Sequence, residues 1–142
     1  MSQAVTGSLR LPLVLETRAL AATQRHLAAF LAEVGCAADT RFRVELVVEE
    51  AVMNIIRHAR PRGAVTATLH VTLRPGGAAI AIEDDGPHFN PLLAPLRPLR
   101  GSHEGGFGLH LIRRHADAAR YRRTGVGINR LELEFIPRPG GT

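Results

Sequence analysis

The order in which helical and extended patterns follow one another constrains the fold of this chain more than any other feature. Apolar residues recur with helical spacing through most of residues 17–59, and alternating segments bounded by turns follow. The elements expected in turn are a strand, two helices, two strands, a helix and two strands, at about 8–16, 17–34, 41–59, 65–73, 78–83, 107–116, 119–123 and 129–136. This order predicts an α+β sandwich in which helices cover one face of a sheet.

Proline, glycine and short polar residues mark where these elements begin and end. Pro12 lies inside the first expected strand and indicates that this strand forms an edge of the sheet. Thr17 is expected to cap the first helix, and Asp39 or Thr40 the second. Residues 75–77, Pro-Gly-Gly, predict the turn of a hairpin.

Length and composition limit the kind of protein that this is. The chain has 142 residues, which suits a single domain with its core at about 8–136. All 18 basic residues are arginine, which excludes a Walker-A lysine and a lysine Schiff base. Cys36 is the only cysteine, so an internal disulfide and a multi-cysteine zinc site are excluded.

Apolar runs and charge bear on location and partners. No run approaches the roughly 18 residues that cross a bilayer, and the first ten residues lack the pattern of a secretory signal. We therefore expect a cytoplasmic protein without a membrane span. The net charge is +5, but the arginines are dispersed and aromatic residues make up only 4%. Direct nucleic-acid binding is not expected, and the basic surface suits an acidic partner as well.

The first pattern that suggests chemistry lies in the second helix. Glu50 and Asn54 are four residues apart, so their side chains lie on the same side of the helix. A carboxylate there accepts a proton from a hydroxyl, and an amide oxygen binds Mg²⁺. The polar strip that holds them has apolar neighbours, which indicates a pocket; it comprises Arg43, Glu50, Asn54 and Arg57. Taken alone, the same spacing is also typical of solvated polar residues.

The second pattern is the acidic end of the strand expected at 78–83. Asp84 and Asp85 follow the apolar strand, and Gly86 begins a turn. A carboxylate at a strand end accepts a hydrogen bond from an exocyclic amine such as that of adenine, and glycine lets the backbone approach a flat ring. Asp-Gly-Pro is also ordinary turn chemistry.

The third pattern is a set of glycines that opens the helix at 107–116. Free N–H groups and the positive end of the helix dipole favour a phosphate there, although such glycines equally mark a hinge. The Pro- and Gly-rich stretch at 86–106 is too long for an ordinary connection and indicates a mobile functional loop. No strand directly precedes the glycines and the full GxGxxG is missing, so a Rossmann site is not predicted.

Together the three patterns resemble the GHKL (Bergerat-fold) ATPase superfamily. Residues 50–54 resemble its N box, residues 84–86 its G1 box and residues 106–109 its G2 box. Within the superfamily, residues from about 11 to 135 resemble the anti-sigma factor serine/threonine-protein kinases of bacterial partner switching (RsbW-type). The resemblance implies a single histidine-kinase-like ATPase domain: a two-layer sandwich whose mixed β-sheet is covered on one face by about three helices.

The resemblance also implies roles for individual residues. Glu50 would be the catalytic base and Asn54 the Mg²⁺ ligand. Asp84 would bind the adenine amine, with Gly86 beneath the ring. The ATP lid would span about 92–105. The other implied nucleotide contacts are Arg57, His58, Phe89, Gly105, Gly106, Phe107, Gly108 and Leu109.

The function that the resemblance implies is a kinase that also acts as a binding switch. Such a homodimer binds ATP with Mg²⁺, sequesters a sigma factor and phosphorylates a serine or threonine of a STAS-type anti-anti-sigma protein. Two residues depart from the pattern, since many relatives have glycine at His88 and aspartate at Asn90. Both adjoin the lid, so they bear on lid geometry and turnover more than on nucleotide binding.

Two other functions stay open on the sequence. One is an adaptor that binds nucleotide and regulates a partner without phosphoryl transfer; Glu50 argues against it, whereas His88 and Asn90 allow it. The other is a detached histidine-kinase catalytic domain. That function needs a helical hairpin with a phosphoacceptor histidine upstream, but the about 40 residues before the second helix predict one strand and one helix.

Overall fold

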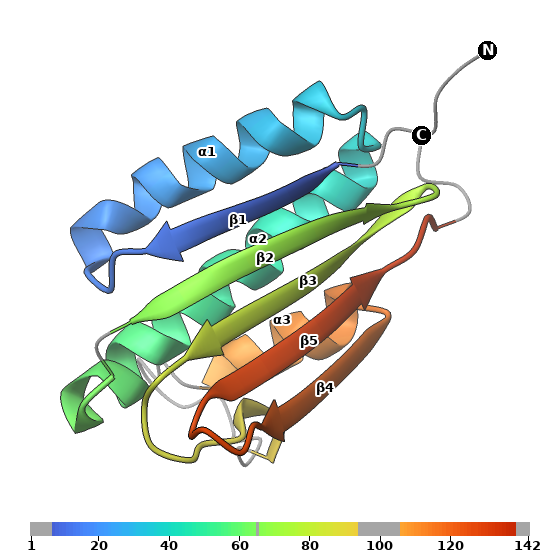
Figure 1. Cartoon of the computed structure of the whole chain (residues 1–142). Coiled ribbons are helices and arrows are strands. Elements are labelled where there is room, and N and C mark those ends of the chain that lie inside the picture. Colours follow the sequence, from blue (N-terminus) through green and yellow to red (C-terminus); the bar gives the residue numbers. More distant parts are fainter. Residues whose placement is uncertain (1–6, 65, 94–105, 139–142) are drawn as a thin grey trace.

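A single sheet with helices on one face forms the framework of the chain (Figure 1). The computed structural model describes residues 7–64, 66–93 and 106–138. Within these residues the sheet has the strand order β1-β2-β3-β5-β4. Its strands are β1 (Ser8–Leu13), β2 (Ala67–Arg74), β3 (Gly77–Asp84), β4 (Ala118–Arg123) and β5 (Asn129–Phe135), and the helices are α1 (Leu20–Glu33), α2 (Ala38–Asn54) and α3 (Gly106–His115). The expected α+β sandwich is confirmed.

The strands pair differently from the expected mixed sheet. Every pair of neighbouring strands in the described part of the chain is antiparallel. β3 and β4 run in the same direction and would form a parallel pair if they were neighbours. The short turn between β4 and β5 instead folds β5 back, and β5 lies between the other two. The resulting register sets Asp84 opposite Asn129.

The helix starts also differ from expectation, because side chains expected as caps are used elsewhere. A 3-10 turn at Thr17–Ala19 precedes α1, and α2 begins at Ala38; neither start has a side-chain cap. Asp39 instead accepts a hydrogen bond from Nε of Arg43 at 3.0 Å, and Thr40 is buried. The expected edge position of the strand that contains Pro12 is confirmed.

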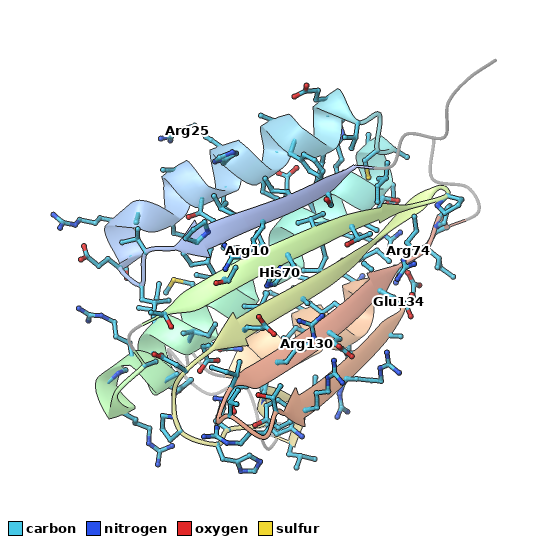
Figure 2. All side chains as sticks on the ribbon, in the orientation of Figure 1. Arg10, Arg25, His70, Arg74, Arg130 and Glu134 are labelled. Carbon is cyan, nitrogen blue, oxygen red and sulfur yellow. The ribbon has the colours of Figure 1, made fainter. Side chains whose placement is uncertain are left out.

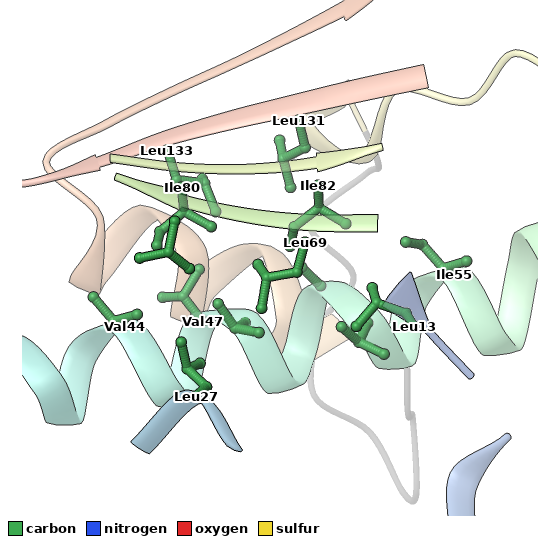
Figure 3. Packing of buried hydrophobic residues seen from close by; sticks show 14 of the residues in the cluster. Leu13, Leu27, Val44, Val47, Ile55, Leu69, Ile80, Ile82, Leu131 and Leu133 are labelled. Atoms are coloured by element: carbon green, nitrogen blue, oxygen red, sulfur yellow. The ribbon is translucent and has the colours of Figure 1, made fainter. Parts of the chain in front are cut away.

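The core lies between α2 and the sheet. The apolar face expected on the second helix is buried, as Val44, Val48 and Val52 show. Figure 3 shows Val44, Val47 and Ile55 facing the side chains that the sheet contributes. Each fully buried aliphatic side chain contributes about 1.5–3 kcal/mol to stability. The helix is therefore held firmly enough to position the polar residues that it carries.

The opposite face of the sheet carries charged side chains (Figure 2). Arg130 pairs with Glu83 at 2.9 Å and with Glu132 at 2.7 Å, and His70 lies 3.1 Å from Glu83. These pairs link neighbouring strands, and ladders of this kind stabilise a sheet by small amounts. None of the helices in the described ranges is long and apolar enough to cross a membrane.

Arg43 on α2 is a charged residue whose side chain is almost completely buried. Its Nη1 donates to the carbonyl oxygen of His115 at 2.9 Å, and its Nη2 donates to that of Ile136 at 2.6 Å. Nη1 also pairs with Asp117 at 3.2 Å. The guanidinium thus joins the start of α2 to the ends of α3 and β5. The expectation that Arg43 shares a pocket with Glu50 was wrong, because its contacts lie at the other end of the helix.

Candidate functional site

The helical segment changes geometry directly after Asn54. Residues Ile55–Ala59 form a π-helical turn, and a 3-10 turn at Arg60–Arg62 follows. Gly63 ends the segment with a φ of 110°, a conformation that glycine adopts without strain. A π turn is wider than an α-helical turn and is frequent at functional sites. It sets the directions in which Arg57 and His58 leave the helix.

Glu50 lies beside Arg57 across this change of geometry. The two side chains are 13% and 25% exposed, and Oε2 of Glu50 is 3.3 Å from Nη1 of Arg57. Burial raises the pKa of the Glu50 carboxyl; Arg57 opposes this rise and Glu49 adds to it. A half-buried carboxylate with a raised pKa is the kind of group that accepts a proton in general base catalysis.

A cavity of about 30 Å³ lies between the end of α2 and the strands β3, β4 and β5. Most of its lining is apolar, with a few polar groups among the side chains. Its lining residues are Ala51, Asn54, Ile55, Ala59, Ile82, Asp84, Phe89, Pro91, Tyr121, Asn129 and Leu131. Asn54 and Asp84, which the sequence places in separate patterns, therefore meet at one cavity. Such a combination of apolar walls and few polar groups is typical of small-molecule sites.

Asp84 lines this cavity, and hydrogen bonds engage one of its two oxygens. The residue is 9% exposed, and its Oδ1 accepts hydrogen bonds from the N–H of Gly86 at 2.8 Å and from Nδ2 of Asn129 at 3.0 Å. Within the described residues, Oδ2 receives no hydrogen bond. One strong acceptor is thus available to a donor in the cavity.

Gly86 supports Asp84 and packs tightly beneath it. A Cβ at this position would lie 2.9 Å from Oδ1 of Asp84 and 3.1 Å from the Cβ atoms of Ala59 and Ala64. Glycine is therefore needed because the turn approaches the end of the helical segment closely. Gly86 does not line the cavity, and its position beneath a flat ring stays a prediction.

His58 and Phe89 form a contact at the rim of the site. Their ring centroids are 5.8 Å apart with planes inclined at 36°, and Phe89 lines the cavity. Burial, Arg57 and Arg62 all lower the pKa of His58. A neutral imidazole is therefore favoured, and the positive charge beside Glu50 comes from Arg57.

The glycines expected at the start of a helix do open α3. The helix begins at Gly106, within two residues of the expected start, so residues 106–109 form its first turn. Gly105 and residues 94–104 of the expected lid lie outside the described residues. Their proposed contacts with phosphate stay predictions.

The two departures from the family pattern make contacts next to the expected lid. The ring of His88 meets that of Tyr121 edge-on, with centroids 5.6 Å apart. Oδ1 of Asn90 accepts the N–H of Leu92 at 2.9 Å and so starts the 3-10 turn at Pro91–Leu93. Both residues hold the chain that leads from Asp84 toward residue 94.

Asn129 is the residue at this site that the sequence patterns did not single out. It is 4% exposed, and its Nδ2 lies 2.9 Å from the carbonyl oxygen of Pro87 and 3.1 Å from that of Gly86. Its Oδ1 accepts hydrogen bonds from Tyr121 at 2.5 Å and from Arg123 at 2.9 Å. Asparagine is uncommon in strands, so an asparagine that begins a strand after a glycine turn was the available signal.

Comparisons with known proteins show the family and the fold of this chain. The family described as Histidine kinase-like ATPase domain matches residues 13–135. The chain is 37% identical over 108 residues to the serine/threonine-protein kinase BtrW of Bordetella bronchiseptica, covering 72% of this chain and 75% of that protein. It also resembles the crystal structure of the RsbU and RsbW domains of Rv1364c from Mycobacterium tuberculosis, with a TM-score of 0.65 at 19% identity. That match covers 94% of this chain and 34% of the other, and it concerns the fold alone.

Proposed function

The chain belongs to the family of histidine kinase-like ATPase domains, in its RsbW-type anti-sigma factor kinase branch, and from this premise we propose that it transfers the γ-phosphoryl group of ATP to a protein. The acceptor in this proposal is a serine or threonine of a STAS-type anti-anti-sigma protein. One observation carries it. The general-base candidate Glu50, the amide of Asn54 and the carboxylate of Asp84 gather at one end of α2, the last two around one cavity.

The cavity suits a 6-amino purine in chemistry. Its apolar walls match a flat ring, and Oδ2 of Asp84 offers an acceptor for an exocyclic amine. Its volume of about 30 Å³ holds roughly one water molecule, so a purine enters only if the lining moves. Phe89 and Pro91 line the cavity and precede the expected lid, and they are the part of the lining that we expect to shift.

Asn54 suits a divalent cation beside the phosphates. It lines the cavity one helical turn from Glu50, and no side-chain hydrogen bond among the described residues engages its amide. Its oxygen is therefore available as a hard ligand of the kind that Mg²⁺ prefers. A bound Mg²⁺ would offset the negative charge that gathers on the phosphates during transfer.

Glu50 acts on the acceptor in this proposal. The hydroxyl oxygen forms a bond to the γ-phosphorus while the bond to the bridging β–γ oxygen breaks, and ADP leaves. The carboxylate of Glu50 takes the hydroxyl proton, for which its raised pKa is suited. Arg57, 3.3 Å from Glu50, favours the ionised carboxylate, and the resemblance implies that it also contacts the nucleotide.

The proposed partners follow from the family. We propose that the chain works in the cytoplasm as a homodimer and sequesters a sigma factor by binding alone, while phosphorylation acts on the antagonist. The name of the Bordetella relative, a serine/threonine-protein kinase, supports a protein as the phosphate acceptor; the dimer, the location and the sigma factor are what the family resemblance implies.

An adaptor without kinase activity is the second candidate. The pairing of Glu50 with Arg57 favours it, because a carboxylate held by a guanidinium is a weaker base. The adaptor would bind ATP and regulate its partner with no phosphate transferred.

Binding and transfer assays separate these possibilities. We expect the chain to bind ATP, and Asp84→Asn to weaken binding by about 1–3 kcal/mol because the amine loses an ionised acceptor. Radiolabel from ATP should pass to a STAS protein that the chain binds, and this transfer should depend on Mg²⁺. Binding without transfer would favour the adaptor, and an intact chain with no affinity for ATP would exclude both.

A further inference from the structure

Asn129 lies beside Asp84, and both residues line the cavity. The β3–β5 register pairs it with Asp84, and the two side chains join at 3.0 Å. We propose that Asn129 is a positioning residue that fixes Asp84 and thereby sets the preference of the site for a base with a 6-amino group. The inference rests on the proposed ATP site and names the residue on which base selection depends.

The hydrogen bonds of Asn129 fix the orientation of its amide. Two donors, Tyr121 and Arg123, approach Oδ1 at 2.5 and 2.9 Å. Three acceptors surround Nδ2, namely Oδ1 of Asp84 and the carbonyl oxygens of Gly86 and Pro87, at 2.9–3.1 Å. Turning the amide over would set oxygen against three acceptors and nitrogen against the Arg123 guanidinium, which donates only, so one orientation is favoured.

The fixed amide in turn fixes the carboxylate. Oδ1 of Asp84 accepts from Asn129 and from the N–H of Gly86, so rotation of the carboxylate would break two hydrogen bonds. Both bonds lie in a buried environment, where an unmet donor is costly. The carboxylate of Asp84, a residue that lines the cavity, is thereby fixed before any ligand arrives, and preorganisation of this kind raises affinity.

Asn129 also holds the turn that begins the path to the expected lid. It binds the carbonyl oxygens of Gly86 and Pro87, and Arg123 adds a second hydrogen bond to that of Gly86 at 3.1 Å. The β4–β5 hairpin therefore acts as a brace for Asp84 and for the turn that follows it. A buried amide at a strand position is unfavourable unless it is fully hydrogen-bonded, and this one is.

Base selection follows from the chemistry of a fixed acceptor. A carboxylate oxygen accepts hydrogen bonds but donates none, so it favours an amine at the purine 6-position. A 6-oxo purine sets an oxygen against that acceptor, and an unsubstituted purine offers no donor. If the carboxylate rotates, the 6-amino group contributes little to affinity, whereas contacts with the ring and the phosphates persist.

The test compares two ligands that differ only in the 6-amino group. Dissociation constants of ATP and of purine riboside triphosphate are measured by calorimetry for the full chain and for Asn129→Ala. The unaltered chain should prefer ATP by at least about tenfold, as a hydrogen bond to a charged group gives. Asn129→Ala should lose about tenfold for ATP and less than about twofold for purine riboside triphosphate, so that the preference disappears.

A matched control lies in the same hairpin. Thr124→Ala removes the hydrogen bond from the N–H of Ile128 to Oγ1 of Thr124, at 3.3 Å, and no hydrogen bond given for the described residues joins Thr124 to Asp84 or Asn129. Its affinities for both ligands should equal those of the unaltered chain. Circular dichroism reports whether each variant is folded.

If Asn129→Ala does not fold, Tyr121→Phe takes its place. This change removes one donor to Oδ1 of Asn129 and leaves Arg123. A loss of about two- to threefold for ATP alone supports the proposal. An equal loss for both ligands, or no loss, contradicts it.

The outcomes separate this inference from the proposed function. If the unaltered chain binds both ligands equally, or if Asn129→Ala weakens both equally, Asn129 does not set base selection although nucleotide binding stands. If the unaltered chain binds neither ligand, the proposed nucleotide site is wrong and the inference falls with it.

Discussion

Arg43 and Arg57 lie on the same strip of one helical segment but have different roles, one in stability and one at the candidate site. Arg43, at 2% exposure, binds the carbonyl oxygens of His115 and Ile136 and has no access to solvent. Arg57, at 25% exposure, pairs with Glu50 at 3.3 Å beside the cavity. One arginine secures the framework, and the other adjusts the charge of a candidate catalytic group. The comparison teaches that a residue type and its helical position do not decide its role; what it meets across the fold does.

The largest expected effect is a loss of stability when Arg43 is replaced. Arg43→Ala should lower the free energy of unfolding by about 3–5 kcal/mol, because the carbonyl groups of His115 and Ile136 lose their donor and Asp117 keeps, among the described residues, only Arg138 as a cation. Urea denaturation measures this change. Arg43→Lys should rescue little of it, since one ammonium group cannot reach acceptors on three elements. A decrease in the free energy of unfolding below about 1 kcal/mol would show that Arg43 has no larger structural role than Arg57.

Replacing Glu50, the proposed base, should slow phosphoryl transfer without a loss of ATP affinity or of stability. Glu50→Gln should slow phosphoryl transfer by roughly 10²–10⁴-fold and leave ATP affinity within about threefold. Stability should stay level or rise, because a half-buried carboxylate with a raised pKa is removed. Single-turnover transfer and calorimetry measure the two quantities. Full activity in this variant would show that Glu50 is not the base.

Arg57 should affect phosphoryl transfer through the pKa of Glu50. Burial raises the pKa of Glu50 and Arg57 opposes that rise, so Arg57→Gln should raise it further. The base is then protonated up to a higher pH, and the acidic limb of the rate profile should move toward higher pH. The free energy of unfolding should change by less than about 1 kcal/mol. A shift toward lower pH, or a stability loss like that of Arg43→Ala, would contradict the comparison.

The smallest effect is expected on the open face of the sheet. Arg122 pairs with Glu132 at 3.2 Å, but its side chain is 63% exposed. Arg122→Gln should change the free energy of unfolding by less than about 0.5 kcal/mol and leave ATP affinity unchanged. Thermal unfolding checks this baseline, against which the other two arginines are judged.

The parts of this molecule that the sequence reveals are those governed by local spacing. Helical periodicity predicts the buried face of α2, and the i, i+4 spacing predicts that Glu50 and Asn54 share a side. The end of an apolar strand predicts the position of Asp84. These features need only the residues of one element.

The parts that the sequence does not reveal depend on which elements meet. The role of Arg43 requires the ends of α3 and β5, more than seventy residues away in the chain. The role of Asn129 requires the β3–β5 register, because a shift by one residue would turn its side chain to the other face. Asp39 is a different case, because Arg43 lies four residues later in the same helix, and this local ion pair replaces the expected cap.

The place of β5 has a consequence for how the chain matures during synthesis. It is the last of the described strands to leave the ribosome, yet it lies between β3 and β4. Until it arrives, both of those strands offer an unpaired edge, and Asp84 lacks the amide that orients it. Nascent chains stalled before residue 129 should therefore bind holdase chaperones, and we expect the proposed nucleotide site to form only once translation has passed this strand.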